Sequence, residues 1–196
     1  DGYGDLTEIR RQVLGNDVTW DVVDLTTEEL IRGCNEGLFE LIDNSTLPSS
    51  QDNISAIEDF IDGTIKPCGV GSIIYSQVYA YNEEVFPGSK PTTIEDFFDT
   101  DTFPGKRALM NSATGNLELA LLADGVQLSE IYNTLQTENG VNRAFKKLLN
   151  IKKDLIWWSS GNEPIQMLIN KEVVMASAWN GRVFQAQVED NEPLAI

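Results

Sequence analysis

The sequence predicts an α/β fold in two compact halves. Short runs of β-branched and aromatic residues alternate with segments whose apolar residues recur at helical spacing, which is typical of sheets that helices cover. The chain has 196 residues, enough for one large domain or two small ones. A stretch with three prolines, residues 83–105, follows the strand-like segment 71–82 and favours a boundary near it. We therefore predict a first lobe over residues 1–78 and a second lobe over residues 79–189.

In the first half, the pattern predicts a β-α-β unit, the building block of a parallel sheet. Residues 20–25, "WDVVDL", form a short apolar run and are expected to be a buried strand. Thr26 or Thr27 can cap the helix that follows, and Gly37 can end it. Residues 38–43, "LFELID", are expected to be the second strand. Amphipathic helical pieces are also predicted at residues 5–14 and 54–61.

Strands and helices continue to alternate through the second half. Residues 71–82 are the most strand-like segment, because they are rich in β-branched and aromatic residues. Thr92 or Thr93 can cap a short helix at residues 94–98, and Gly125 can end a helix that begins near residue 115. Further strands are predicted at residues 107–110, 156–159 and 173–179, and further helices at 128–136, 141–155 and 164–172.

The charge balance argues against nucleic acid as a partner. The chain carries 31 Asp and Glu against 14 Lys and Arg, a formal net charge of −17, and such a surface repels phosphate backbones. Its field favours cationic ligands or partners; the alternative is that the acidity only keeps the protein soluble. The sequence has no run of roughly 20 apolar residues that could span a bilayer, and no N-terminal signal segment.

The sequence does not predict an enzyme, a cofactor or a metal. It has no His, which excludes Ser-His-Asp and Cys-His machinery and ordinary zinc sites. Gly69 and Gly71 lack the third glycine of a dinucleotide-binding fingerprint. Paired acids such as Glu83 and Glu84 lie in polar connecting segments, where solvated faces are the ordinary interpretation.

The two cysteines, Cys34 and Cys68, match no metal or redox spacing. Each lies next to a glycine near the end of a predicted element, so the two could meet in space. They would then form one disulfide in an oxidising compartment, and the alternative is a pair of buried free thiols.

Candidate ligand-binding residues follow the predicted strands, because open α/β sheets bind ligands beyond the carboxyl ends of their strands. Several of them have a structural alternative: the hydroxyl residues can be helix caps, and of the adjacent pair Trp157 and Trp158 at most one can face a cleft. Trp179 ends a strand, directly before the turn pair Asn180–Gly181, and is either core filler or a wall of the site. The candidates are Thr26, Thr27, Ser112, Trp158, Glu163, Trp179 and Asn180.

An ordered set of segments gives the sequence a family resemblance. "WDVVDLTTEELIRGCNEGLFELID", "YSQVYAYN", "PTTIEDFFD", "FPGKRAL", "LELALLADGV" and "EVVMASAWNGR" occur in this order along nearly the whole chain. Together they resemble the periplasmic substrate-binding proteins of ABC importers, in the spermidine/putrescine-binding branch. The resemblance implies an extracytoplasmic solute-binding component that captures a small polar, polyamine-like cation; the alternatives are another small solute, such as an amino acid or osmolyte, or an enzyme on the same scaffold.

The resemblance also implies an architecture and partners. It implies the two-lobed type II periplasmic-binding-protein fold, with residues 72–82 as a first crossover and residues 190–196 as the start of the return crossover. The family's first strand and C-terminal part are then expected to be missing from this chain. The protein would be an exported monomer that docks on a membrane permease, with Cys34 and Cys68 paired in the first lobe.

Carried over to this sequence, the family's site falls on a few positions. Trp179 matches an aromatic residue that stacks on the ligand, a contact that combines apolar burial with cation–π attraction. Leu25 and Thr27 stand where polyamine binders typically offer Ser and Tyr. Ser112 and Gly115 stand where the second lobe of polyamine binders offers two carboxylates, so a cationic ligand would require an acid from elsewhere, such as Glu163.

Overall fold

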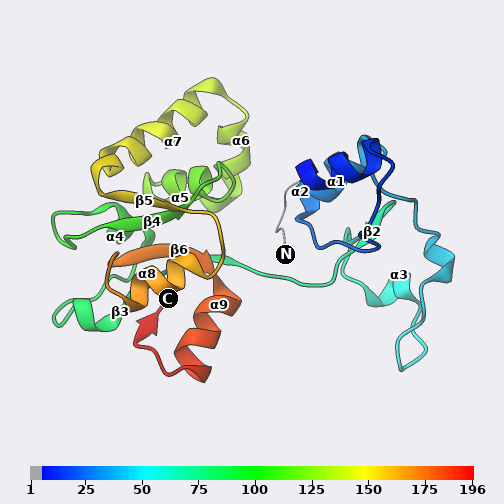
Figure 1. Ribbon diagram of the computed structural model, residues 1–196. Coiled ribbons are helices and arrows are strands. Elements are labelled where there is room, and N and C mark those ends of the chain that lie inside the picture. Colours follow the sequence, from blue (N-terminus) through cyan, green and yellow to red (C-terminus); the bar gives the residue numbers. More distant parts are fainter. Residues whose placement is uncertain (1–5) are drawn as a thin grey trace. The chain divides into compact units, whose positions relative to one another are not determined.

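The computed structural model describes residues 6–196, which divide into two compact units at the bond between Ile74 and Tyr75 (Figure 1). The first four residues of the predicted lobe, and the predicted helix start at residue 5, lie outside the described part. The lobe limits 1–78 and 79–189 stay predictions. The α/β class itself is confirmed, because strands and helices alternate through the second unit.

The first unit consists of helices and one small hairpin, not of a β-α-β unit. Its strands are paired antiparallel, Ile65 with Val70 and Lys66 with Gly69. Helix α2 packs closely against Phe39 at Gly33, where a Cβ would lie 2.3 Å from the Phe39 ring. The elements are α1 Leu6–Leu14, α2 Thr27–Asn35, a 3-10 turn Asn44–Thr46, α3 Ala56–Asp59, β1 Ile65–Lys66 and β2 Gly69–Val70.

The strands predicted at residues 20–25 and 38–43 are wrong for the described chain. Both segments are irregular, and Trp20 and Val22 are 41% and 90% exposed. A strand needs neighbours on its hydrogen-bonding edges, and the described residues supply no partner strand to either segment. Apolar composition alone therefore did not produce a strand here.

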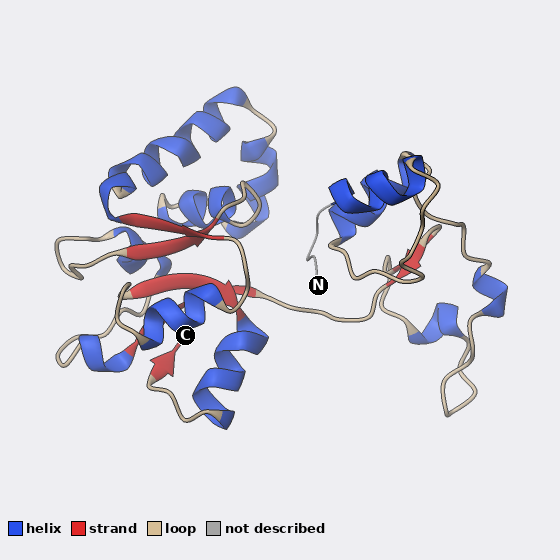
Figure 2. Cartoon of the chain, in the orientation of Figure 1, coloured by secondary structure: helices blue, strands red, loops and turns tan. Residues whose placement is uncertain are grey.

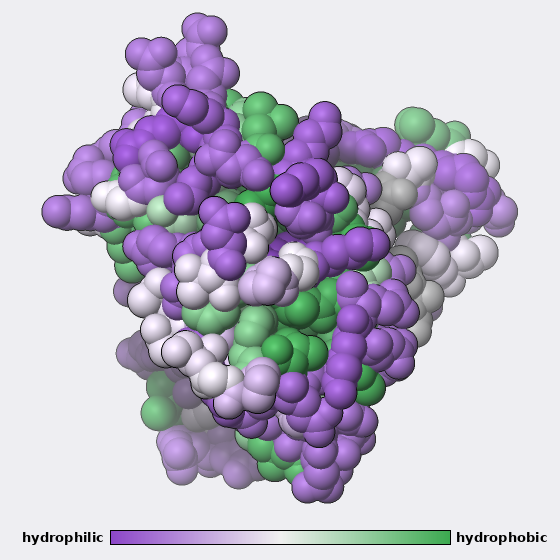
Figure 3. All heavy atoms as spheres, turned by 90° about the vertical axis from the view of Figure 1, so that its left-hand side faces the viewer, coloured by the Kyte–Doolittle hydropathy of each residue, from purple (hydrophilic) through white to green (hydrophobic). Residues whose placement is uncertain are grey.

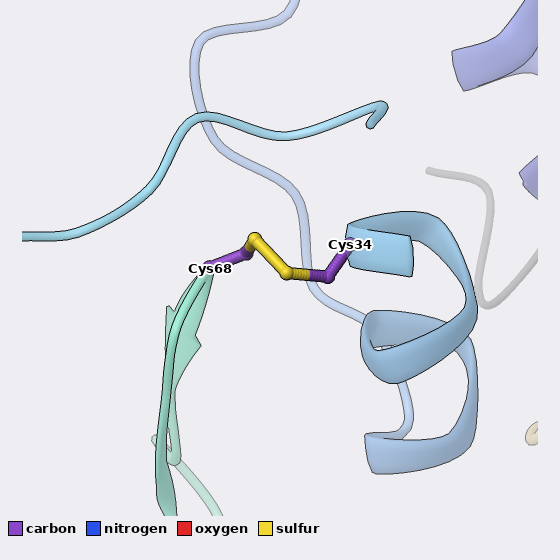
Figure 4. Close-up of a disulfide and its surroundings, with 2 residues drawn as sticks. All are labelled: Cys34 and Cys68. Atoms are coloured by element: carbon purple, nitrogen blue, oxygen red, sulfur yellow. A yellow bond between two sulfur atoms is a disulfide. The ribbon is translucent and has the colours of Figure 1, made fainter. Parts of the chain in front are cut away.

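A disulfide links the end of α2 to the hairpin of the first unit (Figure 4). Cys34 and Cys68 have Cα atoms 5.9 Å apart and close a loop with a sequence separation of 34 residues. The pairing that the sequence left open against two free thiols is present in the structure.

A five-stranded mixed sheet forms the centre of the second unit (Figure 2). Its strand order is β5-β4-β6-β3-β7; β4 is parallel to both neighbours, and β3 is antiparallel to β6 and β7. The strands are β3 Gln77–Asn82, β4 Arg107–Met110, β5 Leu155–Trp158, β6 Met175–Trp179 and β7 Leu194–Ala195.

Helices cover both faces of this sheet. Figure 1 shows α5, α6 and α7 on one side and α8 and α9 on the other. The first side packs Leu109 and Met175 with Leu121 and Ile131 in one core, and the second packs Ala108 and Ala176 with Leu168 and Val183 in another. The helices are α4 Ile94–Phe98, α5 Asn116–Ala123, α6 Ile131–Leu135, α7 Glu138–Asn150, α8 Glu163–Ile169 and α9 Asn180–Phe184, with 3-10 turns at Glu83–Val85, Leu128–Glu130 and Lys152–Asp154.

Most predicted elements of the second half are confirmed, with corrections. The helix predicted at residues 141–155 spans Glu138–Asn150, and Leu155 already begins β5. Thr93 precedes α4 in a capping box with Asp96, and Gly125 follows α5 with a φ of 81°. The strand predicted at residues 71–82 begins only at Gln77. Asn180–Gly181 is not a turn, because α9 begins at Asn180 and a π-helical segment, Gln185–Glu189, continues it.

The surface of the molecule is largely hydrophilic on the face shown (Figure 3). Hydrophilic residues cover most of the face shown in Figure 3, and apolar residues lie between them near its centre. Within residues 6–196, we find no helix with the length and apolar character that crossing a membrane requires.

Candidate functional site

The sheet of the second unit opens between β4 and β6 at the carboxyl ends of these strands. The two strands pair only at Arg107 with Met175 and at Ala108 with Ala176. Beyond that point β4 continues beside β5 as far as Trp158, and β6 continues beside β3 as far as Trp179. The chain also leaves β4 for β5 on one side and returns to β6 on the other, which makes this the switch point where open sheets bind ligands.

Ser177 bridges the opening at its base. Its buried hydroxyl oxygen accepts the backbone N–H of Met110 and the indole N–H of Trp158, each at 3.2 Å. The Ser177 side chain therefore takes the place of a backbone hydrogen bond between β4 and β6. It also orients the ring of Trp158. Sequence reasoning missed Ser177, because a serine inside an apolar strand does not show what it bonds across the sheet.

Trp179 stands at the lip of the opening and is partly buried. Its ring meets those of Trp158 and Tyr75 edge to face, with centroids 5.8 Å and 6.0 Å apart. Gly161, in the loop after β5, lies against the ring so closely that a Cβ there would be 2.4 Å from it. Trp179 therefore has features of both interpretations, core filler and wall of the site. Neighbouring rings and Gly161 hold its ring, while the residue remains partly exposed.

Asn180 fixes the chain next to Trp179. Its side-chain oxygen accepts the backbone N–H of Ser76 at 2.9 Å, and its own backbone N–H donates to the carbonyl of Ser76 at 3.0 Å. The predicted ligand contact of Asn180 therefore has a structural role in this structure, which is to tie α9 to the segment that leads into β3.

Ser112 lies in the turn between β4 and α5, at the opposite side of the opening. Its hydroxyl oxygen accepts the N–H of Thr114 at 3.2 Å, and its carbonyl accepts the side-chain amide of Asn116 at 2.7 Å. The same Asn116 amide donates to the carbonyl of Met110 at 2.7 Å, so the turn is held from inside. Asn116 is 2% exposed, and its side-chain oxygen has no partner among the described residues.

Gly115 and Gln77 meet at this turn. Gly115 has a φ of 81°, a backbone conformation that side chains rarely adopt, and a Cβ there would lie 2.0 Å from the Oε1 of Gln77. Gln77 begins β3 directly opposite Trp179. Its Nε2 is buried and lacks a hydrogen-bond partner within residues 6–196. No local signal in the sequence marks Gln77, because its importance comes from pairing across the sheet.

Two predicted contacts differ from expectation. Trp158 is fully buried, with its indole N–H donated to Ser177, so its side chain offers no surface to a ligand in this structure. Glu163 accepts the backbone N–H groups of Ser159 and Ser160 at 2.7 Å and 3.2 Å. These bonds lower the pKa of the Glu163 carboxyl, and they commit the carboxylate to shaping the loop after β5.

Thr26 and Thr27 belong to the first unit, and the opening described above belongs to the second. Thr26 caps α2 in a capping box, in which its hydroxyl oxygen accepts the N–H of Glu29 at 3.4 Å while the Glu29 carboxylate accepts the N–H of Thr26 at 3.3 Å. Thr27 is the first residue of α2 and is exposed. The capping alternative therefore holds for Thr26.

The other surface features suggest no competing site. A hollow of about 400 Å³ lies between α6 and α7, lined by Asn133, Thr137 and Arg143 among others, and it is wide open to solvent. Arg143 is already engaged there by Asp124. The described residues contain no group of three or more Asp, Glu or Cys that could hold a metal ion.

Comparison with known proteins gives the family. The model of the bacterial extracellular solute-binding protein family matches residues 3–196. A γ-aminobutyric acid-binding protein from Pseudomonas aeruginosa is 40% identical over 186 residues, which cover 95% of this chain and 51% of that protein. The relatives named here are binding proteins, which agrees with the prediction that this chain is not an enzyme.

Solved structures agree in fold. A binding protein, MotA, from Agrobacterium tumefaciens B6 in complex with glucopine has a TM-score of 0.87 at 31% identity, over 100% of this chain and 58% of that one. The Atu4243-GABA receptor has a TM-score of 0.80 at 35% identity, over 100% and 57%. The spermidine/putrescine-binding protein PotD from Streptococcus pneumoniae, at 17% identity and a TM-score of 0.69, covering 97% of this chain and 56% of its own, shares the fold.

The chain thus spans a little over half the length of the relatives it matches. The family match covers nearly every residue, from 3 to 196. The chain belongs to the bacterial extracellular solute-binding protein family.

Proposed function

We propose that the protein is the solute-binding component of an ABC importer and that it captures a small amino-acid-type solute such as γ-aminobutyric acid. It would work outside the cytoplasm, as its family does, and deliver the solute to a membrane permease. The observation that carries the choice of ligand is the neutral polar lining of the switch-point opening beside Trp179, from Ser112, Gly115 and Gln77.

This lining argues against the polyamine ligand that the sequence resemblance implies. A polyamine carries only ammonium groups, and a buried ammonium without a carboxylate partner costs several kcal/mol. Gly115 stands where the resemblance places one of two carboxylates, and neither its φ nor the adjoining Gln77 leaves room for a side chain. Glu163 is committed to two backbone N–H groups. An amino-acid-type solute carries one ammonium group where a polyamine carries two or more, so it fits a lining without free carboxylates better.

Trp179 supplies the apolar part of the contact. Burying a methylene group is worth about 0.8 kcal/mol, and a desolvated cation–π contact adds about 0.5–2 kcal/mol. A solute with a short methylene chain and one ammonium group can use both terms on the same ring. The two relatives whose names contain γ-aminobutyric acid or GABA support this class of ligand.

Capture would proceed without covalent chemistry. A ligand that binds one conformation of the protein better than the others shifts the population toward that conformation by differential affinity. The disulfide between Cys34 and Cys68 supports an exported protein, because such bonds persist in oxidising compartments.

The test is a thermal-shift and calorimetric screen of the full-length protein. γ-Aminobutyric acid at 100 times its dissociation constant should stabilise the protein by about 2.7 kcal/mol, while putrescine and spermidine should have little effect. Stabilisation by putrescine without any effect of γ-aminobutyric acid would refute the proposal and restore the polyamine interpretation.

A matched pair of variants tests the site. Trp179→Ala should lower affinity at least tenfold, because it removes the aromatic wall, about 1.4 kcal/mol per tenfold. Phe145→Ala removes an aromatic side chain that is 50% exposed on α7, away from the opening, and should leave the affinity unchanged. Equal affinities of wild type and Trp179→Ala in a folded protein would show that Trp179 is only part of the core.

A further inference from the structure

We propose that Gln77 determines ligand specificity by donating its side-chain amide to an oxygen of the bound solute, so that the carboxylate end of the ligand faces the second unit. The inference rests on the proposed function and names the group that would distinguish an amino-acid-type solute from a diamine. Gln77 belongs to β3, and neither the motifs nor the resemblance in the sequence single it out.

Its position places Gln77 at the site. In the antiparallel register of β3 and β6, Gln77 lies directly opposite Trp179. Side chains directly opposite each other project from the same face of a sheet and lie about 5 Å apart at their Cβ atoms. The amide of Gln77 also reaches Gly115 across the opening, as shown by the 2.0 Å that would separate its Oε1 from a Cβ at that glycine.

The hydrogen-bonding state of Gln77 indicates that it awaits a partner. Its Nε2 is buried and unpaired among the described residues. Leaving a buried donor unpaired destabilises the folded state, and native proteins retain few such groups. Asn116 directly follows Gly115 and is also buried. Its side-chain oxygen is unpaired among the described residues, while its side-chain nitrogen donates to the carbonyls of Met110 and Ser112.

The orientation of the Gln77 amide is not fixed by a hydrogen bond from its Nε2. Rotation about the Cγ–Cδ bond exchanges the positions of Oε1 and Nε2, and torsions of this kind are soft. No hydrogen bond within the described residues holds Nε2 in its present place. The amide can therefore present its N–H groups to an oxygen that enters the opening.

The two acids nearest to the opening along the chain already have hydrogen-bond partners in the backbone. Two loops border the opening, residues 111–115 after β4 and residues 159–162 after β5. Glu118 and Glu163 are the acidic residues nearest to them along the chain. Glu118 accepts the backbone N–H of Gly115 at 2.8 Å, and Glu163 accepts those of Ser159 and Ser160. Both carboxylates are thus bonded to the backbone. The lining next to Trp179 offers a side-chain donor at Gln77 instead of an acceptor with charge.

The experiment measures the affinities of γ-aminobutyric acid and putrescine for wild type, Gln77→Glu and Gln77→Met by calorimetry on the full-length protein. Gln77→Glu replaces the donor by a carboxylate of the same shape and should weaken γ-aminobutyric acid binding at least tenfold while leaving putrescine binding equal or stronger. Gln77→Met removes the donor without adding charge and should weaken γ-aminobutyric acid about fivefold. Gln127→Glu, which adds the same charge at an exposed position before residues 128–130, should change neither affinity.

The outcomes separate this inference from the proposed function. If wild type binds γ-aminobutyric acid and both Gln77 variants bind it equally well, the inference is wrong and the function stands. A loss of both ligands with a lowered melting temperature in both variants would mean that Gln77 is only structural, which also overturns it. If wild type prefers putrescine, the proposed function fails and the inference fails with it, because a diamine has no oxygen to which the Gln77 amide could donate.

Discussion

Arg107 shows how one buried charge can hold a loop together. The side chain is fully buried at the start of β4, and its guanidinium donates to the carbonyl oxygens of Phe97, Asp99 and Gly105. Burial lowers the pKa of Arg107, and the nearby charges of Asp154 and Asp99 oppose that effect. Arginine suits this position because its planar fork can satisfy several acceptors at once.

We expect Arg107→Met to lower the free energy of unfolding by more than about 3 kcal/mol. The variant keeps most of the buried volume but leaves three carbonyl groups without their donor, and each hydrogen bond to a charged group is worth about 1.5–3 kcal/mol. Chemical denaturation measures the change. Arg182→Met serves as the control on α9, where we expect a smaller effect; an equal loss in both variants would contradict the role given to Arg107.

Glu163 leads to a prediction about pH. Its folded-state pKa lies below the ordinary value of 4.5 because the N–H groups of Ser159 and Ser160 donate to the carboxylate. A depressed carboxyl pKa contributes stability above the unfolded pKa, and this contribution is lost as pH falls through the folded pKa. Wild type should therefore melt higher than Glu163→Gln at pH 7, and the difference should shrink below about pH 4.5. A difference that is independent of pH would show that hydrogen bonding of the neutral side chain, rather than ionisation, stabilises the loop.

At the scale of elements, the sequence predicts those strands whose partners lie within the same unit. Segments 107–110 and 173–179 pair with each other and with other strands of the second unit, and both predictions are confirmed. Segments 20–25 and 38–43 have equally strand-like composition, yet they remain irregular where no described strand lies alongside. The residue pattern indicates the propensity of a segment to form a strand. The strand forms only where the edge of another strand is available for pairing.

The residues of the candidate site also divide into those that the sequence indicates and those that it does not. The sequence predicts Trp179 as a candidate, because a large aromatic residue at a strand end is visible in it. Ser177, Gly161 and Gln77 were not predicted, because each acts through a residue distant in the chain: Ser177 through Met110, Gly161 through the ring of Trp179, and Gln77 through Gly115. Contacts across a sheet follow from the register of its strands. The residue pattern of one strand does not show which residue of the next strand lies opposite.

At the scale of the whole molecule, the two units differ in how they are stabilised. The second unit has two apolar cores, one on each face of its sheet. In the first unit, the buried hydrophobic residues among those described are Leu6, Ile9, Ala56 and Cys68, whereas Val22 and Leu41 are 90% and 77% exposed. A unit with so little buried apolar surface depends on covalent or external support.

Reduction of the disulfide should therefore destabilise the first unit selectively. Closing a loop with a separation of 34 residues is worth about 4 kcal/mol by the chain-entropy estimate, which is a large share of a small unit's stability. We expect the full-length Cys34→Ala/Cys68→Ala variant, or wild type in reducing agent, to lose amide protection in residues 27–70 while the sheet of the second unit stays protected. Hydrogen exchange measured by mass spectrometry resolves the two regions. Reducing agent should have no further effect on the double variant, and uniform loss of protection across both units would contradict the separate stabilisation of the units.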